Sequence, residues 1–145
     1  MTLNVMLDKG AKMPTRAYQN DAGMDLYSKE GYGRYTVEIP PRGSVTFDTG
    51  VHIQIPKGYV GLVKSKSGMN IKSGITCEGV VDADYTGSIR VRLLNTSLDK
   101  AYIVCPGDKI AQLVIIPVVT SQLVKVKEFP ETERGSDGFG STGVR

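Results

Sequence analysis

The acidic residues near the middle of the chain are the first candidates for chemistry. Asp82 and Asp84 lie with Tyr85 in the segment 78–87, which separates two apolar runs and ends in Thr86-Gly87. Turn-forming residues between apolar runs predict a β-hairpin, here with acidic side chains at its tip. A carboxylate at such a tip is ionised at neutral pH and could deprotonate a water molecule if an electrophile were held nearby. From spacing alone, an ordinary turn aspartate explains Asp82 more simply.

Two other polar segments could hold a metal ion or a phosphate. Asp21 and Asp25 form a second acidic pair that could orient a metal ion or an arginine, although a solvated turn is the simpler explanation. The segment 64–68 offers two lysine ammonium groups and two serine hydroxyls beside Gly68. Such a segment suits a phosphate contact and equally a polar surface loop.

The histidine and cysteine content excludes several kinds of chemistry. The one histidine, His52, lies in an alternating apolar and polar segment, so we expect it to face solvent on a half-buried strand. One histidine and two separated cysteines supply too few ligands for a structural zinc site, and a nucleophilic triad would have to use that strand histidine. Cys77 and Cys105 are expected to be reduced packing residues. The chemistry that remains possible uses carboxylates, phosphate-binding loops and hard metal ions.

The segment 134–145 has a composition of its own, because four of its 12 residues are glycine. Its run 138–143 formally matches the Gly-x-Gly-x-x-Gly dinucleotide fingerprint, but that fingerprint needs a strand before it and a helix after it, and neither is predicted here. Glycines still allow backbone N–H groups to approach phosphate oxygens, and Arg134 adds a charged fork. The aromatic face of Phe139 could cap a flat ring. We expect this tail to be mobile alone and to become ordered on a ligand.

Strand patterns dominate the elements that must position these residues. Alternation predicts half-buried strands over 89–93 and 124–127, and apolar runs predict more buried strands over 59–63 and 110–116. No window of about a dozen residues keeps a helical apolar stripe uninterrupted by Gly or Pro. Many short strands at close spacing predict an all-β sandwich or barrel. We place its boundary near residue 130, with a core over 1–130 and a tail over 131–145.

Length and composition limit the class of protein. The chain has 145 residues, which suits one domain, and 40% hydrophobic with 23% charged residues is typical of a soluble globular protein. A net charge of +3 could favour a small anion but is too weak to indicate stable nucleic-acid binding. No apolar run predicts an export signal or a membrane span, so we expect a cytoplasmic location, in the host cytoplasm if the chain is viral.

Five short segments stand in a particular order along the chain. They are Ala-Gly-Met-Asp-Leu at 22–26, Ser-Gly at 67–68, Gly-Val-Val-Asp-Ala-Asp-Tyr-Thr-Gly at 79–87, Pro-Gly-Asp-Lys-Ile-Ala-Gln-Leu at 106–113, and Arg-Gly followed by Gly-Phe-Gly-Ser-Thr-Gly within 134–143. In this order they resemble the five-motif signature of the homotrimeric dUTPase family, and the last three motifs are specific. The resemblance implies a jelly-roll β-sandwich that assembles as a homotrimer with active sites between subunits. It also implies hydrolysis of dUTP to dUMP and pyrophosphate with Mg²⁺, which limits uracil incorporation into DNA and supplies dUMP for dTMP synthesis.

The resemblance implies a role for each matching residue near the reacting bond. Asp82 would activate the attacking water for in-line attack on the α-phosphorus, and Tyr85 would pack under the deoxyribose, leaving no room for a 2′-hydroxyl. The backbone from Gly79 to Val81 would read the uracil edge, because polar groups left unpaired disfavour cytosine and a tight turn excludes the thymine methyl group. Asp25 would lie on the metal side, acting through water on an ion held mainly by substrate phosphates.

The same resemblance implies which groups contact the triphosphate and cover the base. The residues expected at the phosphates nearer the scissile bond are Lys66, Ser67, Gly68 and Gln112. Those expected to close over the γ-phosphate and the uracil ring are Arg134, Phe139, Gly140, Ser141 and Thr142. The tail of one chain would close over a site built by the others.

Two positions depart from the family pattern. Most members have Pro-Arg-Ser-Gly in the second motif, whereas this chain has Ser65-Lys66-Ser67-Gly68, so Lys66 keeps the charge but loses the bidentate fork of arginine. Thr76 stands where some relatives have a base-contacting asparagine. The lysine and the compact chain are similar to bacteriophage members.

Three alternative functions remain open on the sequence. A dCTP deaminase shares the architecture and part of the nucleotide site, but the complete glycine-rich fifth motif favours dUTP hydrolysis. A regulatory nucleotide-binding protein of the same fold would act through a protein partner, which the sequence does not identify. A β-sandwich recognition module without nucleotide binding is the least favoured of the three alternatives.

Overall fold

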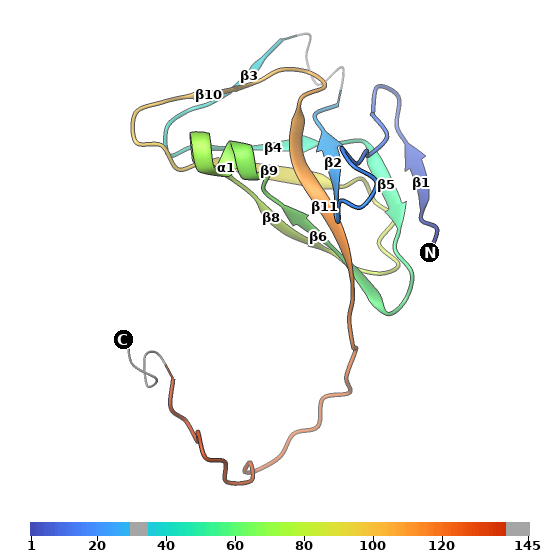
Figure 1. Cartoon of the computed structure of the whole chain (residues 1–145), viewed down its shortest axis with the longest axis vertical. Helices are drawn as coiled ribbons and strands as arrows, with labels where there is room; N and C mark the ends of the chain where they lie inside the picture. Colours follow the sequence, from blue (N-terminus) through green and yellow to red (C-terminus); the bar gives the residue numbers. More distant parts are fainter. Residues whose placement is uncertain (30–34, 139–145) are drawn as a thin grey trace.

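The computed structural model describes residues 1–29 and 35–138, and strands make up most of its regular structure (Figure 1). In chain order the described elements are β1 (Asn4–Leu7), β2 (Gly23–Tyr27), β3 (Val37–Ile39), β4 (Ser44–Asp48), β5 (Val51–Gln54), β6 (Tyr59–Lys64), α1 (Ser67–Ser73), β7 (Ile75–Thr76), β8 (Glu78–Val81), β9 (Arg90–Asn95), β10 (Tyr102–Val104) and β11 (Lys109–Pro117). The strands predicted over 59–63, 89–93 and 110–116 are confirmed as β6, β9 and β11.

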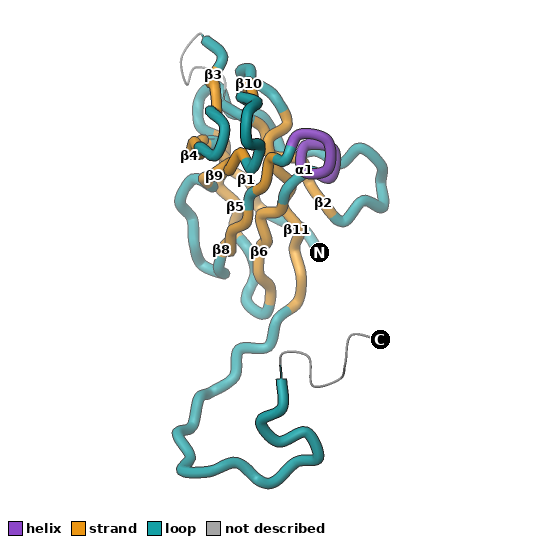
Figure 2. Tube along the Cα trace, turned by 90° about the vertical axis from the view of Figure 1, so that its left-hand side faces the viewer, coloured by secondary structure: helices purple, strands orange, loops and turns teal. Residues whose placement is uncertain are grey.

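The strands form antiparallel sheets that pack as a sandwich. The larger sheet has the order β2–β11–β6–β8, and the second sheet has the order β4–β9–β7. Two further pairs, β1 with β5 and β3 with β10, complete the strand set (Figure 2). The all-β sandwich expected from the sequence is therefore confirmed.

The core lies between these sheets. Along β9, Val91 and Leu93 are buried while Arg92 between them is exposed, as expected for a strand with one face on a core. From the larger sheet, Leu113 of β11 and Val63 of β6 stand opposite each other and are both buried. Each such side chain contributes about 1.5–3 kcal/mol by leaving water, so the two sheets stabilise each other.

The segment predicted as a hairpin instead crosses between the two sheets, so that prediction is wrong. β8 pairs with β6, in a register that places Val81 opposite Gly61, whereas β9 lies between β4 and β7. The chain between β8 and β9 therefore connects two sheets. Apolar runs on either side of a turn predict two strands, but they do not determine which strands pair, because pairing depends on the rest of the sheet.

One short helix, α1, begins within the polar segment 64–68. It runs from Ser67 to Ser73 and has no buried residue. Gly74 caps its C-terminal end, with a left-handed φ of 65° and an N–H that donates to Asn70 O over 3.0 Å. Gly74 suits this end because glycine adopts a left-handed backbone without a Cβ penalty. A seven-residue exposed helix has no apolar stripe, which explains why the periodicity did not predict it.

The chain leaves the sandwich after Pro117. Within the described residues 118–138 there is no helix or strand, and this segment extends away from the sheets (Figures 1 and 2). The strand predicted over 124–127 is therefore wrong, because alternation alone supplies no neighbouring strand for hydrogen bonding. The predicted boundary at residue 130 falls within the extended segment.

Two further expectations from the sequence concern the packing of the cysteines and membrane-spanning segments. Cys77 and Cys105 are both free, but only Cys77 is buried, so the packing role expected for Cys105 is wrong. In the part of the chain that the structure describes, no helix is long and apolar enough to span a membrane.

Candidate active site

Asp82 lies in a turn directly after β8. The Tyr85 N–H donates to the Asp82 carbonyl over 3.3 Å, and Asp84 has a left-handed φ of 69°. The Asp82 side chain is exposed, and within residues 1–29 and 35–138 no hydrogen bond or ion pair engages its carboxylate. The carboxylate is therefore available to bind and orient a water molecule.

The Tyr85 ring is held by its own loop. Its hydroxyl donates to the Ser88 carbonyl over 3.1 Å, and 47% of the residue is exposed. A Cβ atom at Gly87 would lie 2.4 Å from the Tyr85 hydroxyl oxygen. The tyrosine ring therefore packs against residue 87 so closely that any residue other than glycine would displace the ring. The loop thus presents one partly exposed aromatic face close in sequence to Asp82.

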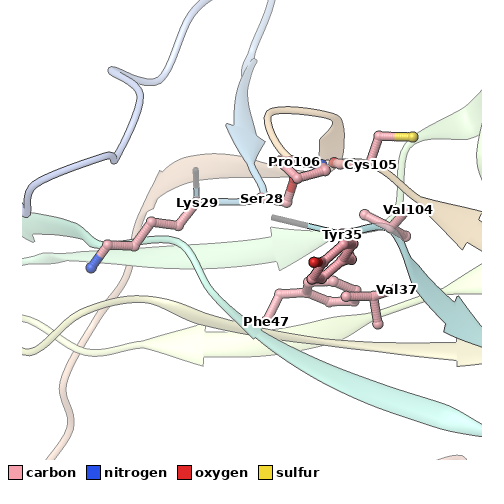
Figure 3. Close-up of a pocket in the computed structure, with 8 residues that line it drawn as sticks. All are labelled: Ser28, Lys29, Tyr35, Val37, Phe47, Val104, Cys105 and Pro106. Atoms are coloured by element: carbon pink, nitrogen blue, oxygen red, sulfur yellow. The ribbon is translucent and has the colours of Figure 1, made fainter. Parts of the chain in front are cut away.

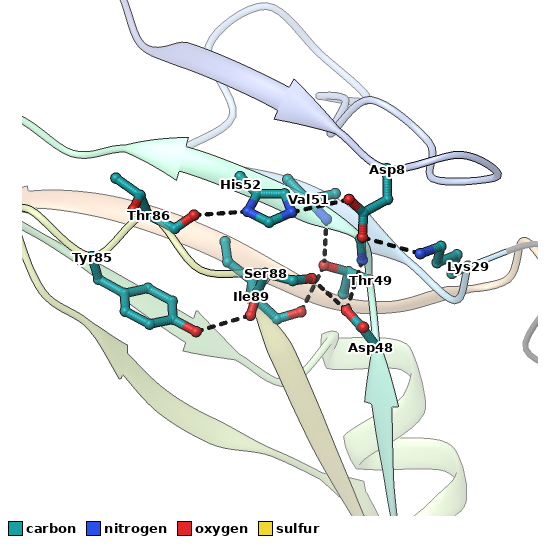
Figure 4. A network of polar contacts seen from close by, with 11 residues as sticks. Asp8, Lys29, Asp48, Thr49, Val51, His52, Tyr85, Thr86, Ser88 and Ile89 are labelled. Carbon is teal, nitrogen blue, oxygen red and sulfur yellow. Dashed lines mark hydrogen bonds and ion pairs between the residues drawn. The ribbon is translucent and has the colours of Figure 1, made fainter.

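The end of this loop is fixed to the corner between β4 and β5 (Figure 4). The Thr49 hydroxyl donates to Ile89 O over 2.7 Å, and the Ser88 hydroxyl donates to the Asp48 carboxylate. His52 of β5 also contacts the loop, at the Thr86 carbonyl, and only 18% of its side chain is exposed. The interpretation of His52 as solvent-facing is therefore wrong, although its place on a strand is confirmed.

The predicted base-reading backbone, Gly79 to Val81, lies on the strand at one edge of the larger sheet. β8 pairs with β6 on one side and is the last strand in the described order, so its other side is not part of a described ladder. An edge strand presents main-chain N–H and C=O groups in a row, and these groups can pair with a planar ligand edge. Val81 is buried in the core, so its contact to a ligand would be made by the main chain.

Asp25 forms an ion-pair cluster with two lysines. Its carboxylate is largely buried and contacts Lys109 Nζ at 2.7 Å and the ammonium of Lys66. Burial opposes ionisation of Asp25, but hydrogen bonds from Lys109 and Lys66 hold its pKa below the ordinary value. The charge on Lys66 thus serves a structural pairing here. Lys109, which sequence reasoning did not single out, belongs to the same cluster.

Gln112 and the start of α1 flank this cluster. In the sheet register Gln112 stands opposite both Asp25 and Lys64, and its Nε2 donates to Ser65 O over 3.0 Å. Ser67 and Gly68 are exposed at the first residues of α1, with nothing within 4 Å of a Cβ atom built on Gly68. The structure therefore brings Asp25, Lys66, Ser67, Gly68 and Gln112 to one end of the larger sheet.

The Asp82 loop lies at the other end of the same strands. β6 and β8 run antiparallel with Lys64 opposite Glu78, and Ser65 to Ser67 continue from that end. Asp82 follows Val81 at the opposite end, where Val81 faces Gly61. The four residue steps from Glu78 to Asp82 span about 13 Å of extended backbone. Within one chain, the predicted catalytic carboxylate and the predicted phosphate-binding residues are therefore apart.

Within one chain, the described tail residue Arg134 belongs neither to the Asp82 loop nor to the phosphate-binding cluster. Arg134 is exposed in the extended segment, and its Nε donates to Asp137 O over 3.0 Å, a contact within the tail itself. Phe139, Gly140, Ser141 and Thr142 lie outside the described residues.

A pocket at the end of β2 contains none of the predicted site residues (Figure 3). It encloses about 10 Å³, which has room for about one water molecule and none for a nucleotide. Its lining residues are Ser28, Lys29, Tyr35, Val37, Phe47, Val104, Cys105 and Pro106.

Comparison with known proteins decides the family. A dUTPase family model matches residues 9–143. The chain belongs to the dUTPase family. The deoxyuridine 5′-triphosphate nucleotidohydrolase of Tropheryma whipplei (strain Twist) is 42% identical over 146 residues, covering 99% of this chain and 96% of that protein. The enzyme of the same name from Paramecium bursaria Chlorella virus 1 is 38% identical over 139 residues, covering 95% of this chain and 94% of that protein.

Solved dUTPase structures resemble the whole chain. The Staphylococcus bacteriophage 80alpha dUTPase with dUpNHpp has a TM-score of 0.87 and 35% identity, covering 99% of both chains. The D95N mutant of the phage phi11 dUTPase has a TM-score of 0.79 and 33% identity, covers 89% of this chain and 99% of its own, and is described as coordinating a structural Mg(II) ion. The jelly-roll fold expected from the resemblance is confirmed. As a dUTPase-family member, the chain is a nucleotidohydrolase of nucleotide metabolism.

Proposed function

We propose that this chain hydrolyses dUTP to dUMP and pyrophosphate by in-line attack of an Asp82-activated water on the α-phosphorus. The observation that carries the proposal is the exposed and unengaged carboxylate of Asp82, directly after an edge strand. An ionised carboxylate with a free lone pair can accept a proton from water as the water attacks. Asp25 is unsuited to this role, because two lysines already occupy its oxygens.

Substrate selection follows from the same loop and strand. The free main-chain edge from Gly79 to Val81 would pair with the uracil edge, and the Tyr85 ring would pack under the deoxyribose. A 2′-hydroxyl would clash with a ring whose position is set by Gly87 and Ser88. In the cell, we propose that this activity, exerted in the cytoplasm of the cell or of a viral host, limits uracil in DNA and supplies dUMP.

The proposed phosphate-binding residues form the second half of the site. Ser67 and Gly68 are exposed for contact near the scissile bond, and the Gln112 amide lies beside them. When substrate binds, the Lys66 ammonium would leave Asp25 and contact the phosphates, where it would neutralise their charge. The remaining residues, Arg134, Phe139, Gly140, Ser141 and Thr142, would come from the tail, gripping the γ-phosphate and covering uracil.

The described residues are compatible with a Mg²⁺ ion that is held mainly by substrate. They contain no group of three or more His, Cys, Asp or Glu side chains placed to hold a metal, and Mg²⁺ commonly binds through one or two carboxylates, waters and substrate phosphates. The Asp25 oxygen that Lys66 would release on contacting substrate would act on the ion through a bound water, and the ion would neutralise charge on the triphosphate. The phi11 relative is described as coordinating a structural Mg(II) ion, so Mg²⁺ binds to at least one protein similar to this chain.

We also propose that complete sites form between copies in a homotrimer. The Asp82 loop and the phosphate-binding cluster lie at opposite ends of the β6–β8 pair, and the tail extends away from both. A site that needs all three groups would therefore draw them from different chains.

The direct test measures Mg²⁺-dependent pyrophosphate release from dUTP, dTTP, dCTP and UTP, with ammonia measured separately. We expect pyrophosphate from dUTP alone at an appreciable rate and no ammonia. Ammonia release from dCTP would favour the deaminase alternative and contradict this proposal.

The role of Asp82 is tested by its amide variant. Asp82→Asn should lower kcat by about 10²- to 10⁴-fold while nucleotide binding stays largely intact, because the amide cannot accept the proton of water. Asp84→Asn is the matched control, since asparagine tolerates the left-handed backbone at that position. A turnover of Asp82→Asn close to that of the control would exclude the proposed role.

A regulatory function is a second candidate, supported by the solved phage relatives. The 80alpha dUTPase is described as controlling the transfer of virulence genes by a proto-oncogenic G protein-like mechanism. If this chain acts similarly, it would bind a protein partner in a nucleotide-dependent way.

A further inference from the structure

His52 lies between two hydrogen-bond acceptors. Its Nδ1 is 2.7 Å from the Thr86 carbonyl oxygen, and its Nε2 is 3.2 Å from Asp8 Oδ1 (Figure 4). Carbonyl and carboxylate oxygens only accept, so each ring nitrogen must donate. A neutral imidazole carries one N–H, and only the imidazolium carries two. Both contacts can therefore be hydrogen bonds only when His52 is doubly protonated.

The charges around the ring favour that form. Asp8, just after β1, contacts the ring directly and also accepts from Lys29 Nζ at 3.1 Å. Asp48, at the end of β4, adds a second carboxylate to the surroundings. The hydrogen bond to Thr86 raises the pKa of His52, partial burial opposes this, and the bond and charge of Asp8 raise it further. The pKa of Asp8 is lowered by its hydrogen bonds to Lys29 and His52, although burial opposes this.

The Thr86 contact matters because of where it lies in the loop. Ser88 and Ile89 are fixed to the β4–β5 corner, whereas the bonds described for Tyr85 stay within the loop, to Asp82 and Ser88. Thr86 is the residue next to Tyr85, so the His52 bond connects that part of the loop to β5. Through Asp8 it also connects the loop to the end of β1.

We infer that His52, as an imidazolium, is a positioning residue that holds the loop 82–89 so that Tyr85 excludes a 2′-hydroxyl. This inference rests on the proposed function of Asp82 and Tyr85. Positioning would be complete when the ring is protonated and would weaken as pH rises through the pKa of His52, because the one remaining ring proton would stay on Nε2 toward the charged Asp8 carboxylate and the bond to Thr86 would be lost. Protonation of His52 would therefore affect the selectivity for dUTP over UTP as well as the stability of the protein.

The protonation state can be measured without substrate. The chain has a single histidine, so the imidazole NMR signals of ¹⁵N-labelled protein, purified without a histidine tag, belong to His52. We expect a titration midpoint above the ordinary value of 6.5, and a lower midpoint in Asp8→Asn. A wild-type midpoint at or below 6.5, or a midpoint unmoved by Asp8→Asn, would overturn the inference. Failure of dUTP hydrolysis would leave this measurement unaffected.

Paired amide variants test the effect on selectivity. In His52→Asn the amide lies near the former Nδ1 and can still donate to Thr86, whereas in His52→Gln it lies near the former Nε2 and reaches toward Asp8. We expect His52→Gln to lower the ratio of kcat/KM for dUTP to that for UTP by about 10-fold and His52→Asn to lower it much less. The wild-type ratio should fall as pH rises through the NMR midpoint, and the Gln variant should lose this dependence.

The control for these variants lies on the same strand pair. Gln54 accepts a hydrogen bond from Asn4 Nδ2 at 2.9 Å, so Gln54→Ala removes a contact between β1 and β5 without touching the loop. Its selectivity ratio should equal that of wild type, and thermal melts confirm that each variant is folded. An unchanged ratio in folded His52→Gln, or an equal loss in Gln54→Ala, would overturn the inference.

Discussion

Two aspartates of this chain show how surroundings decide what a carboxylate can do. Asp25 is largely buried, and two ammonium groups hold it ionised and occupied. Asp82 is exposed with an unengaged carboxylate among the described residues. A paired and buried carboxylate stabilises the fold and orients its partners, whereas a free one can take a proton from water. The same side chain therefore forms ion pairs at one position and, at the other, is available for the chemistry that we propose.

The pairing of Asp25 predicts the effect of removing Lys66. Lys66→Met should lower the free energy of unfolding by about 2 kcal/mol, because a buried carboxylate loses one of its two charged hydrogen-bond donors. Urea unfolding measures this change as a shift in the midpoint. Lys64→Met is the matched control, since it breaks an exposed pair with Glu78 and should leave the midpoint nearly unchanged. Equal shifts in the two variants would contradict the assignment of Asp25 as a buried pair.

At the scale of elements, the loop between β8 and β9 carries the catalytic proposal, and its shape depends on both sheets. It leaves the edge strand of the larger sheet and enters the middle strand of the second sheet. Its far end is bonded to the β4–β5 corner, and its middle is bonded to β5. A loop bonded to other elements at several points can present Tyr85 and Asp82 in one arrangement with little loss of entropy on binding substrate.

The close approach of the Tyr85 ring to the backbone predicts the effect of a methyl group at Gly87. Gly87→Ala would place Cβ 2.4 Å from the tyrosine oxygen, so the ring must move. We expect the selectivity for dUTP over UTP to fall by roughly 10-fold, measured as the ratio of kcat/KM values. Tyr85→Phe keeps the ring and removes only the hydroxyl bond to Ser88, so its loss of selectivity should be smaller. A ratio unchanged in Gly87→Ala would mean that the ring position does not set the selectivity.

At the scale of the whole molecule, the buried core belongs to the sandwich and not to the extended segment. The core residues all lie within residues 24–113, and the residues from Val119 to Asp137 are exposed. The tail therefore contributes little buried apolar area, the main source of folding free energy.

Removal of the tail should separate stability from activity. A chain ending at Glu133 is expected to keep the thermal unfolding temperature of the full chain while losing efficient dUTP hydrolysis. Thermal melts and pyrophosphate release measure the two properties on the same sample. A clear drop in unfolding temperature would contradict the independence of the sandwich.

Mixing two inactive variants tests whether sites are shared between copies. Asp82→Asn retains the tail, and the chain ending at Glu133 retains Asp82. Refolded together, they should form mixed oligomers in which some sites combine the intact carboxylate with an intact tail, so hydrolysis should return. Hydrolysis that stays at the level of the separate variants would indicate that each site belongs to one chain.

Sequence patterns predicted the strands and the motif residues, but they did not predict the pairing. β6, β9 and β11 were predictable because burial follows a local alternation, and the strand expected over 124–127 failed because no neighbouring strand pairs with it. The hairpin was wrong because β8 pairs with β6 rather than with β9. His52 was read as solvent-facing because its partners lie 34 and 44 residues away in the chain.

The sequence by itself determined the all-β class and the family motifs, and it made Asp82 and Tyr85 candidate site residues, since residue type and local order carry that information. Only the tertiary structure decided that Asp25 is held by Lys66 and Lys109, that the Asp82 loop crosses between sheets, and that the two halves of the proposed site lie apart within one chain. The physical reason is that ion pairs, sheet register and burial depend on residues brought together from distant parts of the chain, and those distances do not appear in local patterns.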